Sequence, residues 1–187
     1  MVRSNWIAYI NPLRFSSNPA GTQRIYGIAR SLAGVGYDVT IGSGDSSPAT
    51  PVVLEQRSVK GKLYYVGLNE APLAKTSVIT KSYSWFVALG ERTVQCLDKQ
   101  PTLPSHVIVY APQAPMVFRL LRWCRRRGVT LICDVVEWYN PWHVQGGPLG
   151  PLNMSIKLAL QFLNLRSDGI IVISSYLANY YQRRGCR

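Results

Sequence analysis

Short apolar segments alternate with amphipathic segments along this chain, and that alternation constrains the fold more than any other feature of the sequence. Short segments with so few polar positions are typical of strands buried on both faces of a parallel sheet. The sequence predicts strands at Trp6–Ile10, Tyr37–Ile41, Val52–Leu54, Lys62–Val66, His106–Tyr110, Val129–Cys133 and Ile170–Ile173. Helical patterns separate most of them, so we predict an α/β fold with a doubly wound, Rossmann-like parallel sheet.

The expected helices are delimited by residues that favour helix ends. One is expected from Thr22 to Gly34–Gly36, whose glycines suit a C-cap. Others are expected at Ser82–Asp98, Met116–Arg127, Pro151–Arg166, and from Ser174–Ser175 to Arg184. A chain of 187 residues that alternates in this way predicts one domain over 1–187.

The chain is strongly basic, with 21 Lys and Arg against 9 Asp and Glu and a net charge of +12. Such a surface attracts anions, namely nucleic acid, anionic membranes or phosphorylated small molecules. The arginines form two clusters, Arg119, Arg122, Arg125, Arg126 and Arg127, and then Arg183, Arg184 and Arg187. A solvated helix face is the ordinary explanation of such clusters. No nucleic-acid-binding motif accompanies them, so nucleic acid is not an expected partner.

Cysteine usage and hydropathy suggest a cytoplasmic protein. The four cysteines form no CxxC pair and have no metal-type spacing with His106 or His143, so we expect reduced thiols and no metal. No signal peptide follows Met1, and no apolar stretch reaches about 18 residues. The apolar helix at 152–165 fits either a buried core or a membrane interface. Peripheral attachment to the inner face of an anionic membrane is therefore a further expectation.

The strongest candidate site follows the strand at Val129–Cys133. The segment after it carries acids, large aromatics and a histidine at Asp134, Glu137, Trp138, Tyr139, Trp142 and His143. In parallel α/β sheets, ligands bind beyond the carboxyl ends of the strands. The alternative is an edge loop with core aromatics and solvated acids.

The first strand–helix turn is a weaker candidate for binding phosphate. It lacks GxGxxG and the P-loop lysine pattern, so neither a dinucleotide nor a P-loop fingerprint is present. What remains is Gly21 and Thr22 at a helix start, where free backbone N–H groups favour anions. A plain loop is the favoured interpretation of this turn. The chain also has no GxSxG nucleophile elbow.

Three segments resemble the N-terminal, acceptor-binding domain of GT-B-type retaining glycosyltransferases, family 4-like. They are Asn18–Ile41, with a glycine loop, helix and GYDV entry to a strand; Cys133–Tyr139, CDVVEWY; and Ser167–Tyr181, SDGIIVISSYLANYY. The resemblance implies one half of a GT-B architecture and an enzyme that transfers a hexose from a nucleotide-sugar to a glycan, lipid-linked or other acceptor. Polysaccharide biosynthesis at a membrane is the expected setting. The alternative function is a non-catalytic basic module that docks on anionic membrane or nucleic acid.

By the same resemblance, Gly21 and Thr22 would approach the donor diphosphate, and Asp134 and Glu137 would lie at the reacting sugar. This sequence has no histidine in that acidic segment, which is a departure from the family pattern. The acceptor would contact Trp138, Tyr139, Trp142, His143 and Ser174. The donor-binding C-terminal domain is absent from these 187 residues. The expected partner is therefore that domain or a separate subunit, with no cofactor, and the chain alone should be inactive.

Overall fold

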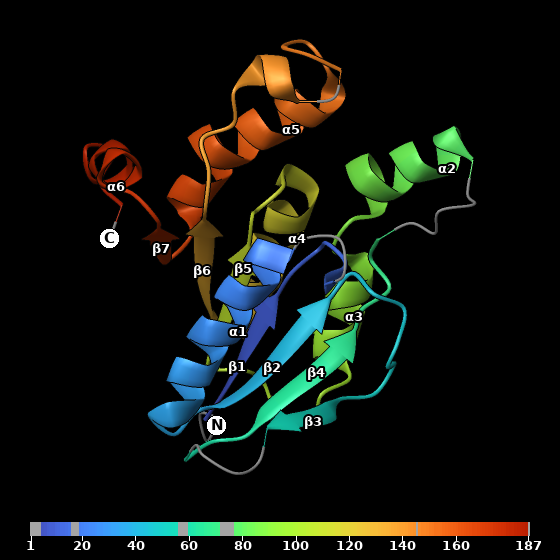
Figure 1. The fold of residues 1–187 in the computed structure, drawn as a ribbon, viewed down its shortest axis with the longest axis vertical. Coiled ribbons are helices and arrows are strands. Elements are labelled where there is room, and N and C mark those ends of the chain that lie inside the picture. The colour runs from blue at the N-terminus through green and yellow to red at the C-terminus, as the bar shows by residue number, and fades with distance from the viewer. Residues whose placement is uncertain (1–4, 16–18, 56–59, 72–76, 145, 187) are drawn as a thin grey trace.

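A computed structural model describes residues 5–15, 19–55, 60–71, 77–144 and 146–186. Seven strands form one sheet in the order β3-β4-β2-β1-β5-β6-β7 (Figure 1). Their bounds are β1 Trp6–Ile10, β2 Asp38–Ser43, β3 Val52–Glu55, β4 Leu63–Gly67, β5 His106–Tyr110, β6 Thr130–Val135 and β7 Gly169–Val172. This arrangement confirms the predicted α/β fold.

The edge strand β3 departs from the predicted parallel sheet. Every other strand pair is parallel, but β3 pairs antiparallel with β4, with Val52 opposite Tyr65. A parallel crossover needs about a dozen residues or more. Since only positions 56–62 separate the two strands, the connection permits an antiparallel pair alone.

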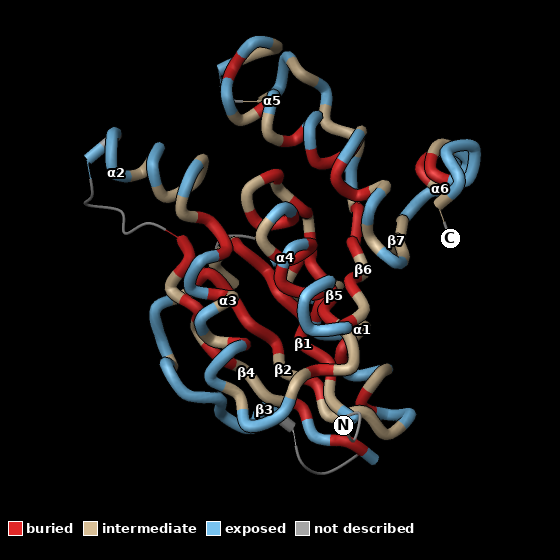
Figure 2. Tube along the Cα trace, turned by 180° about the vertical axis from the view of Figure 1, so that it is seen from behind, coloured by how far each residue is buried: buried red, intermediate tan, exposed pale blue. Residues whose placement is uncertain are grey.

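Helices cover both faces of the sheet. On one face, α1 (Pro19–Gly34) packs Ile25, Ala29 and Ala33 against residues of β1, β2, β4 and β5. On the other face, α3 (Glu91–Asp98), α4 (Ala114–Arg127), α5 (Pro151–Leu158) and α6 (Ser175–Gln182) share a larger core. The central strands are accordingly the most deeply buried part of the chain (Figure 2).

Two predicted helix boundaries differ from the structure. The first helix begins at Pro19, so Gly21 and Thr22 lie inside its first turn. The prediction of a single helix at Ser82–Asp98 is wrong. The segment is divided into α2 (Val78–Tyr83), a π-helical turn at Ser84–Ala88, and α3. The break lies at Gly90, whose φ of +96° suits glycine.

The apolar helix predicted at Pro151–Arg166 has the expected extent but not a uniform geometry. After α5 it continues as a π-helical turn at Ala159–Leu163 and a 3-10 turn at Asn164–Arg166. No helix in the described part of the chain is long and apolar enough to cross a membrane.

Candidate functional site

The topology brings most of the predicted site residues to one edge of the sheet. Because β1, β5, β6 and β7 are parallel neighbours in one sheet, their carboxyl ends lie along a common edge. The first turn of α1 follows β1, the acidic aromatic loop at 136–144 follows β6, and Ser174 follows β7. We call this the carboxyl edge.

Asp134, at the end of β6, is fully buried and makes hydrogen bonds to side chains of β1 and α1. Its Oδ2 accepts a hydrogen bond from the Tyr9 hydroxyl at 2.5 Å. Arg24 of α1 donates to both carboxylate oxygens, through Nη2 to Oδ1 at 2.7 Å and through Nε to Oδ2 at 3.2 Å. A buried carboxylate requires such partners because its charge is otherwise costly. This contact therefore ties the first helix to the ends of β1 and β6.

The ionisation of the two partners follows from this contact. Burial, reinforced by the charge of Asp134, raises the pKa of Tyr9 far above its ordinary value. The hydrogen bonds to Asp134 raise the pKa of Arg24 further. Tyr9 therefore stays neutral and Arg24 stays charged. Asp134 has no exposed surface, so a direct contact with a reacting sugar would require the contact with Arg24 to open.

Glu137, in contrast, is exposed on the loop that leaves β6. Its neighbour Tyr139 is half-buried, and burial together with the negative charge of Glu137 raises the pKa of Tyr139 to about 12. The phenol is thus a neutral hydrogen-bond donor at physiological pH. Glu137 is the predicted acid that solvent and ligands can reach.

The aromatic side chains of the loop have different surroundings. Trp138 packs edge-on against Tyr176 and Tyr180 of α6, at centroid distances of 6.1 and 4.8 Å. Trp142 and His143 lie in a short 3-10 helix at Pro141–His143, and both are exposed, Trp142 by 79%. Trp138 therefore anchors the loop to α6, while Trp142 presents its ring to solvent.

The hydroxyl groups of Thr22 and Ser174, both predicted to contact ligand, make hydrogen bonds with backbone groups. The Thr22 hydroxyl donates to the Phe15 carbonyl at 2.8 Å, which fastens the β1–α1 loop to the helix. Ser174 is the N-cap of α6, and its Oγ accepts from the Leu177 N–H at 3.3 Å. Gly21 is buried in the first turn of α1. Gly21 and Thr22 lie inside the first turn of α1 rather than at its start, Ser174 caps α6 as expected, and the ligand contacts proposed for all three stay predictions.

Three features of the edge were missed by the sequence analysis. Asp45, after β2, accepts hydrogen bonds from the Phe15 N–H, the Ser43 hydroxyl and the Tyr65 hydroxyl at 2.7–3.0 Å. Burial raises the pKa of Asp45, but these hydrogen bonds outweigh it and leave that pKa below its usual value. The second is Arg24, whose place in a helical pattern gave no sign of its distant partner.

The third is Asn11, which directly follows β1 and is fully buried. Its Oδ1 accepts from the Leu13 N–H at 3.0 Å, whereas its Nδ2 has no hydrogen-bond partner among the described residues. An unpaired buried donor is uncommon and marks a position of interest. The Asn11–Pro12 pair suggested only a strand end in the sequence.

A hollow of about 370 Å³ adjoins the loop on α6. It is lined by Tyr176, Asn179, Tyr180, Arg183 and Arg184. The Arg184 guanidinium lies 4.4 Å from the centre of the Tyr180 ring. Trp138 packs against both tyrosines, so it joins the acidic loop to the helix that lines this hollow. In the described residues, no three His, Cys, Asp or Glu side chains are grouped so as to hold a metal ion.

Comparison with known proteins finds likenesses only at the level of structure. No protein-family model matches the chain, and no curated protein matches it. A trehalose-6-phosphate synthase studied with bisubstrate glycomimetics is similar with a TM-score of 0.46 and 12% identity, over 96% of this chain and 42% of the synthase. A UDP-forming α,α-trehalose-phosphate synthase from Burkholderia vietnamiensis has a TM-score of 0.41 and 13% identity, over 96% of this chain and 43% of the synthase. The chain therefore spans less than half the length of either synthase.

Proposed function

We propose that this chain is the acceptor-binding half of a glycosyltransferase that moves a sugar from a nucleotide-sugar to a glycan, lipid-linked or other acceptor. The observation that carries the proposal is the loop after β6, where exposed Glu137 and Trp142 leave the carboxyl edge of the sheet. The sequence resemblance in Asn18–Ile41, Cys133–Tyr139 and Ser167–Tyr181 supports the same class of enzyme.

The loop offers the chemistry that a sugar acceptor needs. Aromatic rings pack on the apolar faces of sugar rings, and Trp142 has a free face for this contact. A carboxylate accepts hydrogen bonds from sugar hydroxyls, and Glu137 is free to do so. The neutral Tyr139 phenol beside it supplies a donor. His143 and the α6 hollow extend the same polar and aromatic surface.

In the transfer step, the bond from the anomeric carbon to the donor phosphate breaks and a bond to the acceptor oxygen forms. The acceptor hydroxyl loses its proton, and we assign Glu137 as the group that accepts it or orients that hydroxyl. Asp134 positions the loop and α1 through Arg24 and Tyr9. Retention at the anomeric carbon is what the sequence resemblance implies.

The donor side is expected to come from a second α/β domain or subunit. Gly21 and Thr22, in the first turn of α1, would face the donor diphosphate, because the N-terminal end of a helix favours negative charge. No metal or cofactor is required in this scheme. The chain alone is then inactive in sugar transfer.

Replacing Glu137 with glutamine tests the proposal in a form of the protein that includes the donor-binding half. Glutamine keeps the shape but cannot take a proton, so we expect kcat to fall by about 100-fold or more. The measurement is release of nucleoside diphosphate from a panel of nucleotide-sugars. Glu91→Gln is the matched control, since Glu91 is an exposed acid on α3 and should leave kcat unchanged. Kinetics like those of the unmodified enzyme in Glu137→Gln would remove this residue from the site.

A further inference from the structure

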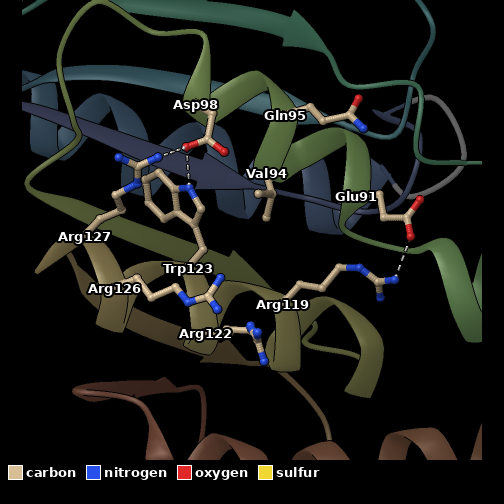
Figure 3. A pocket seen from close by; sticks show the side chains of 9 residues that line it. All are labelled: Glu91, Val94, Gln95, Asp98, Arg119, Arg122, Trp123, Arg126 and Arg127. Carbon is tan, nitrogen blue, oxygen red and sulfur yellow. Dashed lines mark hydrogen bonds and ion pairs between the residues drawn. The ribbon is translucent and has the colours of Figure 1, made fainter.

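A basic groove lies between α3 and α4, away from the loop after β6. It has a volume of about 530 Å³, and arginines from α4 form one wall (Figure 3). Two of them are paired at 2.9 Å, Arg119 with Glu91 and Arg127 with Asp98. Arg122 and Arg126 have no hydrogen-bond or ion-pair partner in the described part of the chain, and Figure 3 shows them between the two ion pairs. The groove therefore carries uncompensated positive charge.

Exposed apolar side chains lie beside these arginines, on α4 and on the neighbouring helix α5. On α4, Phe118, Arg122 and Arg125 are spaced i, i+4 and i+7, so these exposed side chains share one stripe of the helix. Phe118 of α4 is 57% exposed, and Leu158 and Phe162 in and after α5 are 47% and 54% exposed. They face solvent, although their neighbours Ala159, Leu160 and Leu163 are buried. The sequence left a core and a membrane interface as alternatives for this helix, and the structure gives it a buried apolar side and exposed apolar residues.

Two hydrogen bonds show that α4 and the helical segment at 151–166 lie side by side. The Ser155 hydroxyl accepts from the Ala114 N–H at 3.3 Å near the start of both helices. Arg125 donates to the Arg166 carbonyl at 3.2 Å near their ends. The helices thus run in the same direction, with exposed Phe118 between Ala114 and Arg125 along one, and exposed Phe162 between Ser155 and Arg166 along the other. We call Phe118, Arg122, Arg125, Arg126, Leu158 and Phe162 the α4–α5 face.

This combination matches an anionic lipid surface better than other polyanions. Surfaces that bind at a membrane interface place Phe and Leu beside Lys and Arg, so that apolar groups enter the lipid while cations bind headgroup phosphates. Nucleic-acid phosphates would bind the arginines, but an exposed leucine makes no stacking or hydrogen-bond contact with a base. Glu91 and Asp98 are the acids that line the groove, and each is already paired with arginine. The face therefore complements negative charge.

We propose that the α4–α5 face docks this protein on an anionic lipid bilayer. Phe118, Leu158 and Phe162 enter the interface, and Arg122, Arg125 and Arg126 bind lipid phosphates. The two helix axes then lie along the membrane plane. Such docking needs neither a sugar donor nor a second domain, so it stands or falls independently of the proposed sugar transfer.

Vesicle flotation with the full chain tests this docking. Vesicles of phosphatidylglycerol and phosphatidylcholine should bind the protein, whereas pure phosphatidylcholine should not, and added salt should weaken the binding. We expect Arg122→Ala/Arg126→Ala to lower the partition coefficient by about 30-fold, which corresponds to about 1 kcal/mol per basic contact. Phe118→Ser/Phe162→Ser should lower it by about tenfold, because the lost apolar area no longer enters the interface. All four side chains are exposed, so both variants should fold.

The matched control is Lys60→Ala/Lys62→Ala, which removes the same charge beside the far edge of the sheet, next to β4. Binding in this control should stay within about twofold, because these lysines lie off the face. A loss as large as that of the arginine variant would show a whole-molecule charge effect and overturn the proposal. Equal binding to neutral vesicles would also overturn it. So would unchanged binding by Phe118→Ser/Phe162→Ser, because the arginines alone would then account for an attraction to any polyanion.

Discussion

Replacing Arg24 with leucine is expected to lower the free energy of unfolding by about 3 kcal/mol. The change leaves the fully buried Asp134 carboxylate without its cation, and breaking one side of a buried ion pair typically costs about 3–5 kcal/mol. The Tyr9 hydrogen bond stays in place, which puts the expected loss at the lower end of that range. Urea unfolding followed by circular dichroism measures it.

The controls for this prediction separate the buried pair from a general effect of removing an arginine. Arg30→Leu removes an exposed arginine from the same helix and should cost less than about 1 kcal/mol. In an Asp134→Asn background, Arg24→Leu should cost much less than it does alone, because the buried charge is already gone. Equal losses for Arg24→Leu and Arg30→Leu would contradict the account of this contact.

The second large effect is a loss of stability at alkaline pH from two buried thiols. Burial raises the pKa of Cys124 and of Cys133 to about 12. In the unfolded chain they ionise near pH 9, so above that pH the unfolded state binds fewer protons than the folded state. Stability is therefore full below about pH 9 and is lost as pH rises toward 12. Each thiol contributes about 1.4 kcal/mol per pH unit, or roughly 5 kcal/mol for the pair by pH 11.

Urea unfolding at pH 8, 9.5 and 11 measures this loss. Cys124→Ala/Cys133→Ala should remove much of the slope between pH 8 and 9.5, where most of each unfolded tyrosine, with an ordinary pKa near 10, still carries its proton. Above pH 10, Tyr9 adds to the loss, because its folded pKa is also raised. A stability that is flat from pH 8 to 10 would contradict the burial of these thiols.

Much of the sheet could be predicted because its strands are short apolar runs between helical patterns. The antiparallel direction of β3 follows from its short connection to β4, and the strand pattern alone does not give the direction of a strand. The division between α2 and α3 depends on the positive φ of Gly90. Buried Glu70 stabilises the start of α3, because its carboxylate accepts from the backbone N–H groups of Gly90 and Thr93. The contact between Glu70 and the start of α3 joins residues about 20 positions apart, so the hydrophobic periodicity of the sequence does not reveal it.

The sequence predicts where the candidate site lies along the chain, but it does not predict which of the site residues are buried and which are exposed. Asp134 and Glu137 are three positions apart and look alike as acids, yet one is buried and the other exposed. What separates them is the partner Arg24, 110 residues away. Trp138 and Trp142 differ in a similar way, since Trp138 packs against two tyrosines of α6 and Trp142 is exposed. Tertiary contacts assign these roles, and they are invisible in the spacing of residues.

The central claim is that the loop after β6 is an acceptor surface, and Trp142→Ala tests it most directly. In an active form that includes the donor-binding half, we expect the acceptor KM to rise about fivefold, the loss of one aromatic packing contact, while the donor KM stays unchanged. Trp142 is 79% exposed, so the variant should fold normally, and Tyr83→Ala on α2 is the matched exposed-aromatic control. A raised donor KM with an unchanged acceptor KM would contradict the claim and place this loop on the donor side.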